Sequence, residues 1–293
     1  MSKTFVSEIS LEQAKLMKQD LEEAGFTFSE RPYSLFFAQK KGLCVQAYTS
    51  GKLVIQGKEM GEFIEFYVEP MLGDFSFTTK ELTVDKTPHI GGDESGKGDF
   101  FGPLCIAAVY ASSEAIEKLS EKGVQDSKTL TDTRIKKLKP LIMSLCTFEV
   151  VTISPLKYNA LYEKFQNLNT LLAWGHAAAI GAVIEKAGNH PVLVDKFASE
   201  SVLERAVRQK GLDIKLTQKT KAESDIAVAS ASILARAAFI ESLEHLSKEI
   251  GVVLPKGASK AVNDAARRIA DTQGKETLMR CAKMHFKTAD PYK

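Results

Sequence analysis

Two apolar segments of this sequence end directly in carboxylates, and each is followed further along the chain by helical periodicity. Residues 90–92 lead into Asp93 and Glu94, and residues 192–194 lead into Asp195. Short apolar runs of this kind are typical of buried strands, and strands that alternate with helices form an α/β domain. Such sheets bind ligands beyond the carboxyl ends of their strands, so we expect Asp93, Glu94 and Asp195 at one edge of one sheet.

The rest of the C-terminal two thirds supplies the remaining elements of this sheet. Further strands are predicted at residues 104–110, 147–153 and 214–216, and helices at 155–165, 169–187 and 224–247. The first three strands are close enough in sequence for hairpins, whereas the later ones are joined through helices. The pattern predicts an α/β domain with a mixed five-stranded sheet flanked by helices, over residues 89–293.

The first 80 residues follow a different pattern and are predicted to form a small α+β domain. Ser10 and Gln13 form a capping box before a helical stretch that ends at Gly25. Short apolar and aromatic runs at 35–40, 44–48 and 52–56 predict antiparallel hairpins, and residues 59–68 predict a second helix. The aromatic side chains expected in its core are Phe36, Phe37, Tyr48, Phe63, Phe66 and Tyr67. We place a polar linker at residues 81–88.

The bulk composition is that of an ordinary soluble globular protein. Of 293 residues, 44% are hydrophobic and 26% charged, with no run of about 18 apolar residues and no targeting signal at the start. The four cysteines contain no C-x-x-C pair, so the sequence indicates neither a zinc site nor a disulfide framework. We therefore expect a cytoplasmic protein, monomeric, without an organic cofactor or a membrane partner.

The glycine-rich segment at residues 91–103 (GGDESGKGDFFGP) nearly matches a phosphate-binding loop. That loop requires Ser or Thr after its lysine, because the hydroxyl binds magnesium, and a helix must follow. Here Gly98 follows Lys97, and Asp93 and Glu94 would place negative charge where phosphates bind. A nucleotide-binding protein of this type is kept only as a distant alternative.

Carboxylates gathered at one sheet edge would repel one another unless cations lay between them. Hard divalent ions prefer oxygen ligands, and two of them about 4 Å apart can hold both the attacking and the leaving oxygen of a phosphoryl transfer. Gly96 and Gly98 flank Lys97, so the backbone there is open to the close approach of a ligand such as an RNA 2′-hydroxyl. A solvated acidic turn remains the alternative interpretation of Asp93 and Glu94 by themselves.

Five sequence blocks, in the same order, resemble ribonuclease HIII, a family of type 2 RNase H enzymes. The blocks are residues 93–103 (DESGKGDFFGP), 126–128 (DSK), 194–197 (VDKF), 221–236 (KAESDIAVASASILAR) and 254–258 (LPKGA). The resemblance covers about residues 90 to 290. It implies an RNase H-like fold and an endonuclease that hydrolyses the RNA strand of RNA/DNA hybrids with two Mg²⁺ or Mn²⁺ ions, leaving 5′-phosphate and 3′-hydroxyl ends.

On the family pattern, the metal-binding and catalytic acids are Asp93, Glu94, Asp195 and Glu223, and the substrate contacts are Ser95, Gly96, Lys97, Gly98, Ser127 and Lys128. Asp225 lies two residues beyond Glu223 and competes for the fourth role, but Glu223 occupies the family position. A related family, ribonuclease HII, typically has Asp there, so Glu223 favours the resemblance to ribonuclease HIII. An activity like that of ribonuclease HII, on single ribonucleotides in duplex DNA, is the main alternative.

The first domain resembles the repeat of the TATA-binding protein over residues 48–58 (YTSGKLVIQGK), and ribonuclease HIII carries such a domain before its catalytic one. A curved sheet with one open face would bind the hybrid through lysines, namely Lys40, Lys41, Lys52 and Lys58. Of the histidines, His176 is interpreted as a packed residue of an Ala-rich helix, and His285 is given no catalytic role.

Overall fold

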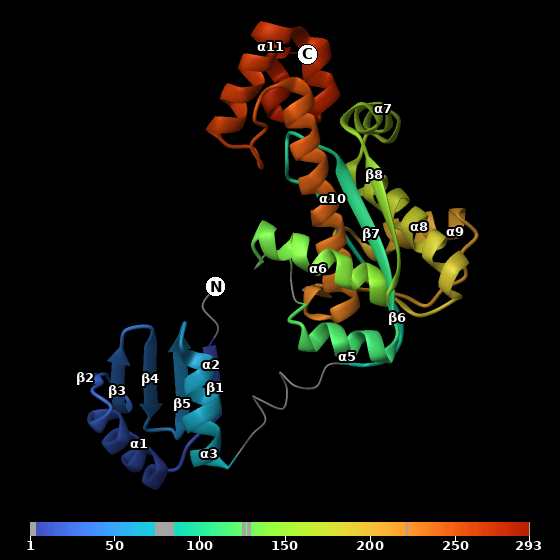
Figure 1. Ribbon diagram of the computed structural model, residues 1–293. Helices are drawn as coiled ribbons and strands as arrows, with labels where there is room; N and C mark the ends of the chain where they lie inside the picture. Colours follow the sequence, from blue (N-terminus) through green and yellow to red (C-terminus); the bar gives the residue numbers. More distant parts are fainter. Residues whose placement is uncertain (1–3, 74–84, 125–126, 128–129, 221, 293) are drawn as a thin grey trace. The chain divides into compact units, whose positions relative to one another are not determined.

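The computed structural model describes residues 4–73, 85–124, 127, 130–220 and 222–292, apart from the Glu223 side chain. The chain forms two compact units, Met1–Thr83 and Val84–Lys293, each with its own core (Figure 1). The predicted linker at 81–88 falls partly on residues outside those described. All four cysteines are free thiols.

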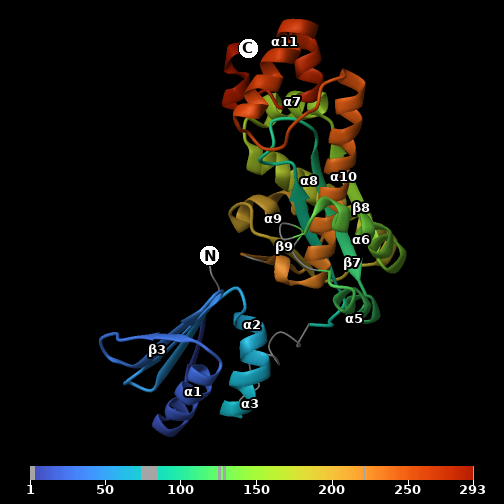
Figure 2. The same cartoon turned by 60° about the vertical axis from the view of Figure 1, so that its left-hand side comes forward.

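The smaller unit is a five-stranded antiparallel sheet in the order β1-β5-β4-β3-β2. Its elements are β1 (Thr4–Glu8), α1 (Leu11–Glu23), β2 (Thr27–Ser29), β3 (Ser34–Lys40), β4 (Leu43–Tyr48), β5 (Lys52–Gly57), α2 (Met60–Phe63), a π-helical segment (Ile64–Val68) and α3 (Glu69–Leu72). The helices lie on one face of the sheet (Figure 2). The three predicted strands are confirmed, and β1 and β2 complete both edges of the sheet.

Alternation of side chains along β4 explains why only one face of this sheet is covered. Leu43, Val45 and Ala47 are buried against α1 and the later helices, whereas Cys44 and Gln46 point to the other face and are only partly buried. The predicted aromatic core is wrong for Tyr48, which shares the partly buried face of β4 with Cys44 and Gln46, and for Phe66, whose exposed fraction is 74%. The π-helical segment changes the helical spacing there, so the side chain turns to solvent.

The larger unit is built on a mixed five-stranded sheet, as the sequence predicted, and its strands follow the order β10-β9-β6-β7-β8. Its strands are β6 (His89–Ser95), β7 (Leu104–Ala111), β8 (Thr147–Ile153), β9 (Val192–Asp195) and β10 (Leu216–Lys219). β6 pairs antiparallel with β7 and parallel with β9. The last strand begins two residues later than predicted, because its ladder to β9 starts at the pair Leu216 and Val192, while Ile214 packs against the core ahead of it.

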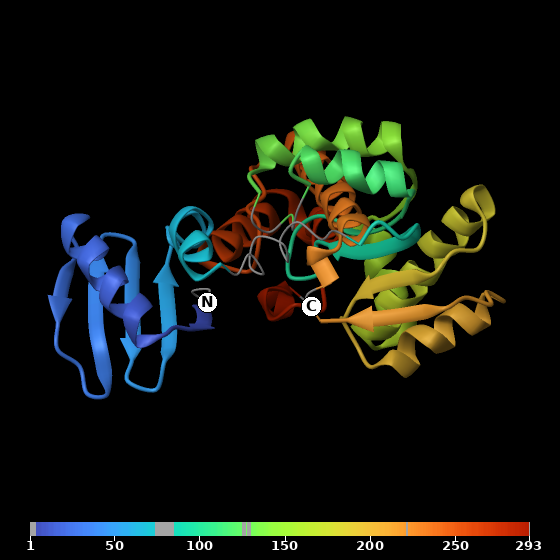
Figure 3. The ribbon, with the colours of Figure 1, turned by 90° about the horizontal axis from the view of Figure 1, so that it is seen from below.

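Helices cover both faces of this sheet. Figure 3 shows the green helices α5 and α6 on one side and the yellow α8 and α9 on the other. The helices are α5 (Ser113–Glu121), α6 (Asp132–Leu145), α7 (Pro155–Phe165), α8 (Leu168–Ala187), α9 (Glu200–Gln209), α10 (Ile226–Ile250) and α11 (Lys260–Cys281). One hydrophobic core joins α5, α6, α10 and α11 to the sheet, and a second joins α7, α8 and α9 to its other face. No helix was predicted from the sequence at residues 260–281.

Helix α10 packs directly on β6, and a glycine makes this contact possible. A β-carbon at Gly91 would lie 2.2 Å from the carbonyl carbon of Ala227, far inside the distance that atoms tolerate.

Helix α10 is also long and apolar enough to cross a membrane by composition alone, but 78% of its most apolar window is buried inside this unit. Its apolar surface is therefore that of a core helix.

Candidate active site

Three of the four predicted acids lie in one pocket of about 400 Å³ at the carboxyl ends of β6 and β9. Gly92 pairs with Val194 in the parallel ladder, so the residues that follow them, Asp93 and Asp195, leave neighbouring strands side by side. The pocket is lined by Asp93, Glu94, Ser95, Gly96, Lys97, Gly98, Asp99, Ser127, Asp195, Lys196, Phe197, Ser232, Arg236, Phe239 and Lys256.

The fourth predicted acid belongs to a short helix attached to this edge. The 3₁₀ segment Ala222–Ser224 follows β10, and the backbone N–H of Ala222 donates a hydrogen bond of 3.1 Å to Asp195 Oδ1. The backbone of position 223 therefore adjoins the residue that is bonded to Asp195. The side chain of Glu223 lies outside the described part of the structure, so its role stays a prediction.

Asp225, the competing residue, has a different use. Its Oδ1 accepts hydrogen bonds from the N–H groups of Ala227 and Val228 and so caps the N-terminus of α10. The same oxygen lies 2.9 Å from His89 Nε2. Asp225 does not line the acid pocket, and its carboxylate is committed to helix capping.

Asp93 is a buried carboxylate placed beside another carboxylate. Its exposed fraction is 5%, and its Oδ1 accepts a hydrogen bond of 2.8 Å from the backbone N–H of Glu94. Burial, together with the nearby charge of Glu94, raises the pKa of Asp93 to about 7. Near neutral pH, a cation that compensates the charge of the Asp93 carboxylate would therefore stabilise its ionised form.

Glu94 is held by a histidine of α8, the helix that packs on this face of the sheet. His176 of α8 is completely buried, and its Nε2 lies 3.1 Å from Glu94 Oε2, while Lys97 Nζ lies 3.5 Å from Oε1. Burial acts to raise the pKa of Glu94, but the hydrogen bond from His176 and the charge of Lys97 outweigh it, so the pKa lies below its usual value. His176 is packed, as predicted, but it also contacts Glu94 in the site, a role that was not predicted from the sequence.

The donor set fits hard divalent cations. Asp93, Glu94 and Asp195 offer only oxygen ligands, which Mg²⁺ and Mn²⁺ prefer, and the pKa of Asp93 is raised by burial and by the charge of Glu94, both of which a cation would offset. Among the described side chains, no three His, Cys, Asp or Glu residues are already arranged as a metal-binding group. The predicted set includes Glu223, so the described side chains give three of its four members.

The loop after β6 forms one wall of the pocket. Ser95, Gly96, Lys97 and Gly98 all line it, in agreement with their predicted place beside the acids. Gly96 has φ +87°, and a β-carbon there would lie 2.3 Å from the carbonyl oxygen of Pro103. No atom lies within 4 Å of the place where a β-carbon of Gly98 would stand, so the backbone at that position is accessible from outside.

This loop also excludes the phosphate-binding arrangement considered from the sequence. A P-loop leads from a strand into a helix, whose N-terminal N–H groups bind the phosphates. Here β6 is joined through residues 96–103 to β7, with which it pairs antiparallel. The segment therefore lacks the helix that the nucleotide-binding alternative needs.

Ser127 lines the same pocket, but its hydroxyl group is engaged within the protein. Its exposed fraction is 3%, and its Oγ lies 2.7 Å from Ser232 Oγ on α10. Arg236, one turn further along α10, donates to the carbonyl oxygen of Ser127 at 2.6 Å. Direct substrate contact by Ser127 stays a prediction, and Lys128 lies outside the described residues.

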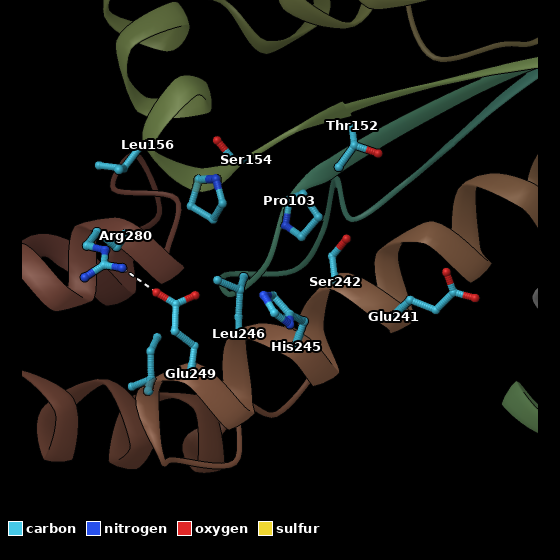
Figure 4. Close-up of a pocket in the computed structure, with 12 residues that line it drawn as sticks. Pro103, Thr152, Ser154, Leu156, Glu241, Ser242, His245, Leu246, Glu249 and Arg280 are labelled. Atoms are coloured by element: carbon cyan, nitrogen blue, oxygen red, sulfur yellow. Dashed lines mark hydrogen bonds and ion pairs between the residues drawn. The ribbon is translucent and has the colours of Figure 1, made fainter.

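A second pocket, of about 430 Å³, contains none of the predicted acids (Figure 4). It lies between the start of α7, the last three turns of α10 and the end of α11, with Arg280 paired to Glu249 in its wall. Pro103, at the end of the loop after β6, also lines it. His285, which was given no catalytic role, stacks on Tyr162 with ring centroids 4.4 Å apart.

Comparison with known proteins agrees with this geometry. A family model described as Ribonuclease HII matches residues 90–289, and one described as a domain of unknown function (DUF3378) matches residues 4–72. The chain is 51% identical to a ribonuclease HIII of Protochlamydia amoebophila, over 98% of this chain and 95% of that protein. It is 49% identical to a ribonuclease HIII of Chlamydia pneumoniae, over 98% and 97% of the two chains.

Solved structures show the same relationship. A crystal structure of Bst-RNase HIII in complex with Mn²⁺ superposes with a TM-score of 0.69 at 28% identity, covering 98% of this chain and 97% of that one. Aquifex aeolicus RNase H3 superposes with a TM-score of 0.59 at 31% identity, covering 97% and 100%. The RNase H-like fold and the resemblance seen in the sequence are confirmed. The chain belongs to the ribonuclease HIII family and is a metal-dependent endoribonuclease.

Proposed function

We propose that this protein cuts the RNA strand of RNA/DNA hybrids internally, by hydrolysis that leaves 5′-phosphate and 3′-hydroxyl ends. The observation that carries the proposal is the convergence of Asp93, Glu94 and Asp195 in one pocket at the end of β6 and β9. With Glu223 they would hold two Mg²⁺ or Mn²⁺ ions. When bound, these ions supply an activated water molecule and stabilise charge on the leaving oxygen.

The protein's own groups would prepare this site in three ways. His176 fixes the orientation of Glu94 from the buried side. The Asp93 backbone lies in the sheet, so its carboxylate is held rigidly rather than on a mobile loop. Lys97, whose side chain is 38% exposed beside Glu94, would contact the phosphate of the substrate strand.

Selection for RNA would come from the loop that lines the pocket. The open space at Gly98 would let the sugar of a ribonucleotide come within hydrogen-bond distance of the backbone. A 2′-hydroxyl both donates and accepts hydrogen bonds, and DNA lacks it at this position. Ser127 and Lys128 would contact the strand beside the cleavage site.

The small unit would increase affinity for the hybrid. Lys40, Lys41, Lys52 and Lys58 are all exposed, and its sheet carries helices on one face only. Phosphate groups of a duplex bind such cations with little regard to sequence. The protein would act as a monomer in the cytoplasm, where its four free thiols stay reduced.

The test is cleavage of a hybrid in which the RNA and DNA strands carry different labels, with Mg²⁺, with Mn²⁺ and with a chelator. The expected result is cutting of the RNA strand alone, only with metal, and its loss in Asp93→Asn and in Glu223→Gln. His245→Gln, which alters the second pocket, is the matched control and should cut normally. Persistent cleavage by both acid variants would contradict the proposed site.

A second activity, cutting at single ribonucleotides in duplex DNA, is favoured by one observation: the catalytic unit matches the family model described as Ribonuclease HII. A DNA duplex with one embedded ribonucleotide separates the two. Efficient cutting just 5′ of that ribonucleotide, with weak cutting of a continuous hybrid, would replace the activity proposed above with that alternative.

A further inference from the structure

Lys283 is completely buried, and its ammonium group is surrounded by backbone carbonyl oxygens of the loop between β6 and β7. Nζ donates hydrogen bonds of 2.8 Å to the carbonyl of Asp99 and 2.7 Å to that of Gly102, with Phe101 at 3.4 Å. These three acceptors match the three N–H groups of an ammonium. One side chain therefore binds most of the second half of the loop.

The backbone on both sides of this lysine is paired with the same loop. The N–H of Lys283 donates to the carbonyl of Phe100 at 2.8 Å, and the N–H of Gly102 donates to the carbonyl of Cys281 at 2.9 Å. Phe101 and Ala282 form an antiparallel bridge between these bonds. The segment after α11 thus serves as a short partner strand for residues 100–102.

A second support reaches the loop from the other direction. Asp99 Oδ1 accepts a hydrogen bond of 2.6 Å from the N–H of Gly257, and the N–H of Phe100 donates to the carbonyl of Gly257. Behind the end of the loop, in contrast, Pro103 and Arg280 face the second pocket (Figure 4). Phe100 and Phe101 are completely buried in the core, so packing and these hydrogen bonds together hold the loop, whereas packing is less complete beside Pro103.

Burying this ammonium is costly, which argues against a purely structural use. Burial lowers the pKa of Lys283 to about 7, and the charge of Asp99 only partly opposes this. For folding alone, an apolar side chain of similar size usually serves as well as a buried charge or better. What the ammonium adds is a fixed position for three carbonyl groups at once.

We propose that Lys283 is a positioning residue for substrate binding, which holds the loop so that its Gly96–Gly98 segment stays at the edge of the acid pocket. Residues 99–102 are tied to the C-terminal segment, and residues 96–98, directly before them, line the pocket. A loop released from Lys283 would have to be ordered again each time substrate binds, which weakens binding. The inference rests on the proposed function, because its substrate is the RNA/DNA hybrid.

The experiment compares Lys283→Met, which keeps the apolar stem and removes the donors, with Lys283→Gln, which keeps two donors without the charge. Lys186→Met is the matched control, because it removes an exposed lysine paired with Glu149. Steady-state cleavage of the hybrid gives KM and kcat, and amide hydrogen exchange followed by mass spectrometry reports on the loop without any need for activity.

For Lys283→Met we expect KM to rise about tenfold while kcat changes less than about threefold, since ground-state positioning is lost and the acids are untouched. Amides in residues 96–102 should exchange faster, with Lys283→Gln between this variant and the wild type. If KM and loop exchange stay as in the wild type while thermal stability falls, Lys283 only supports folding, and the proposal is overturned.

If Lys283→Met does not fold, the same comparison is made with Lys283→Gln alone, for which a rise in KM and faster loop exchange are still expected. A wild-type protein that leaves hybrids uncut would refute the proposed function instead. The exchange measurement would then still show whether Lys283 holds the loop, so the two failures are distinguishable.

Discussion

His176 Nε2 lies 3.1 Å from Glu94 Oε2, although the two residues belong to different elements, α8 and β6, and are 82 positions apart in the chain. The histidine reaches Glu94 past Gly92, where a β-carbon would lie 3.4 Å from its Nδ1. His176 is completely buried and gives Glu94 a hydrogen-bond partner of fixed position, so its loss removes the group that orients this carboxylate.

His176→Ala is therefore expected to lower kcat by about 10- to 100-fold and to weaken metal binding, with a smaller effect on KM. Metal titrations of cleavage rate measure both effects. His176→Gln, which retains a donor, should recover part of the activity. An alanine variant with normal kcat and normal metal dependence would show that His176 is a packing residue only.

The charge of Asp93 predicts a gain in stability when it is removed. Without metal, Asp93→Asn should melt at a higher temperature than the wild type, because a buried carboxylate beside Glu94 no longer has to be accommodated. Saturating Mg²⁺ should stabilise the wild type, by about 2.7 kcal/mol at 100 times its dissociation constant, and leave the variant nearly unchanged. Thermal unfolding with and without Mg²⁺ tests this, and an equal shift in both proteins would contradict it.

Alanine substitutions at two glycines should distinguish a role in packing from a role in substrate contact. Gly91→Ala places a β-carbon against the backbone of Ala227, so we expect a loss of about 3 kcal/mol or failure to fold. Gly98→Ala meets no atom within 4 Å and should keep the unfolding free energy of the wild type, yet it should raise KM if the substrate backbone approaches there. Urea unfolding and hybrid cleavage measure the two quantities. An unchanged KM in Gly98→Ala would remove that residue from the substrate surface.

The exposed lysines of the small unit lead us to expect that it raises the affinity for a long RNA/DNA hybrid. Deleting residues 1–80 should raise KM for a long hybrid with kcat nearly unchanged, and it should make binding less sensitive to salt, because phosphate contacts are lost. Kinetics at two salt concentrations provide the measurement. A large fall in kcat would instead mean that this unit shapes the catalytic site.

The pair His89 and Asp225 predicts how stability depends on pH. Burial acts to lower the pKa of His89, but hydrogen bonds with Asp225 and with the carbonyl of Thr87 outweigh it, so the pKa is raised. A raised histidine pKa adds stability below its ordinary value of about 6.5, and this stability is lost as pH rises through the folded-state value. His89→Gln should therefore destabilise the protein more at pH 5.5 than at pH 8.5.

Urea unfolding at both pH values checks this difference, with His245→Gln as the control histidine. The same loss at both pH values would mean that the protonated form of His89 adds nothing to the folded state, and that its hydrogen bonds to Asp225 and Thr87 matter only as neutral contacts.

The sheet and its acidic edge could be predicted because they depend on local patterns. The runs before Asp93 and Asp195 are short, apolar and separated by helical periodicity, which determines both the strands and the edge at which they end. The loop at residues 96–98 was also placed correctly beside the acids. These features need only the alternation of elements along the chain.

The supporting contacts could not be predicted in the same way. Helix α8 is apolar on nearly all sides, so no periodic stripe indicated which way His176 points. The capping role of Asp225 depends on where α10 begins, a boundary that the sequence placed two residues too early. Lys283 is buried because a loop far away in the sequence presents three carbonyl groups to it, and no local sequence pattern around Lys283 indicates this contact.

The apolar character of α10 has a consequence for the newly made chain. A ribosome delivers the whole sheet, α5 and α6 before Ile226–Ile250, so most of the surface that will cover this helix has already been synthesised when it emerges. A helix with the composition of a membrane span would otherwise be open to aggregation or to misdirection toward the bilayer. The order of elements along the chain keeps that period of exposure short.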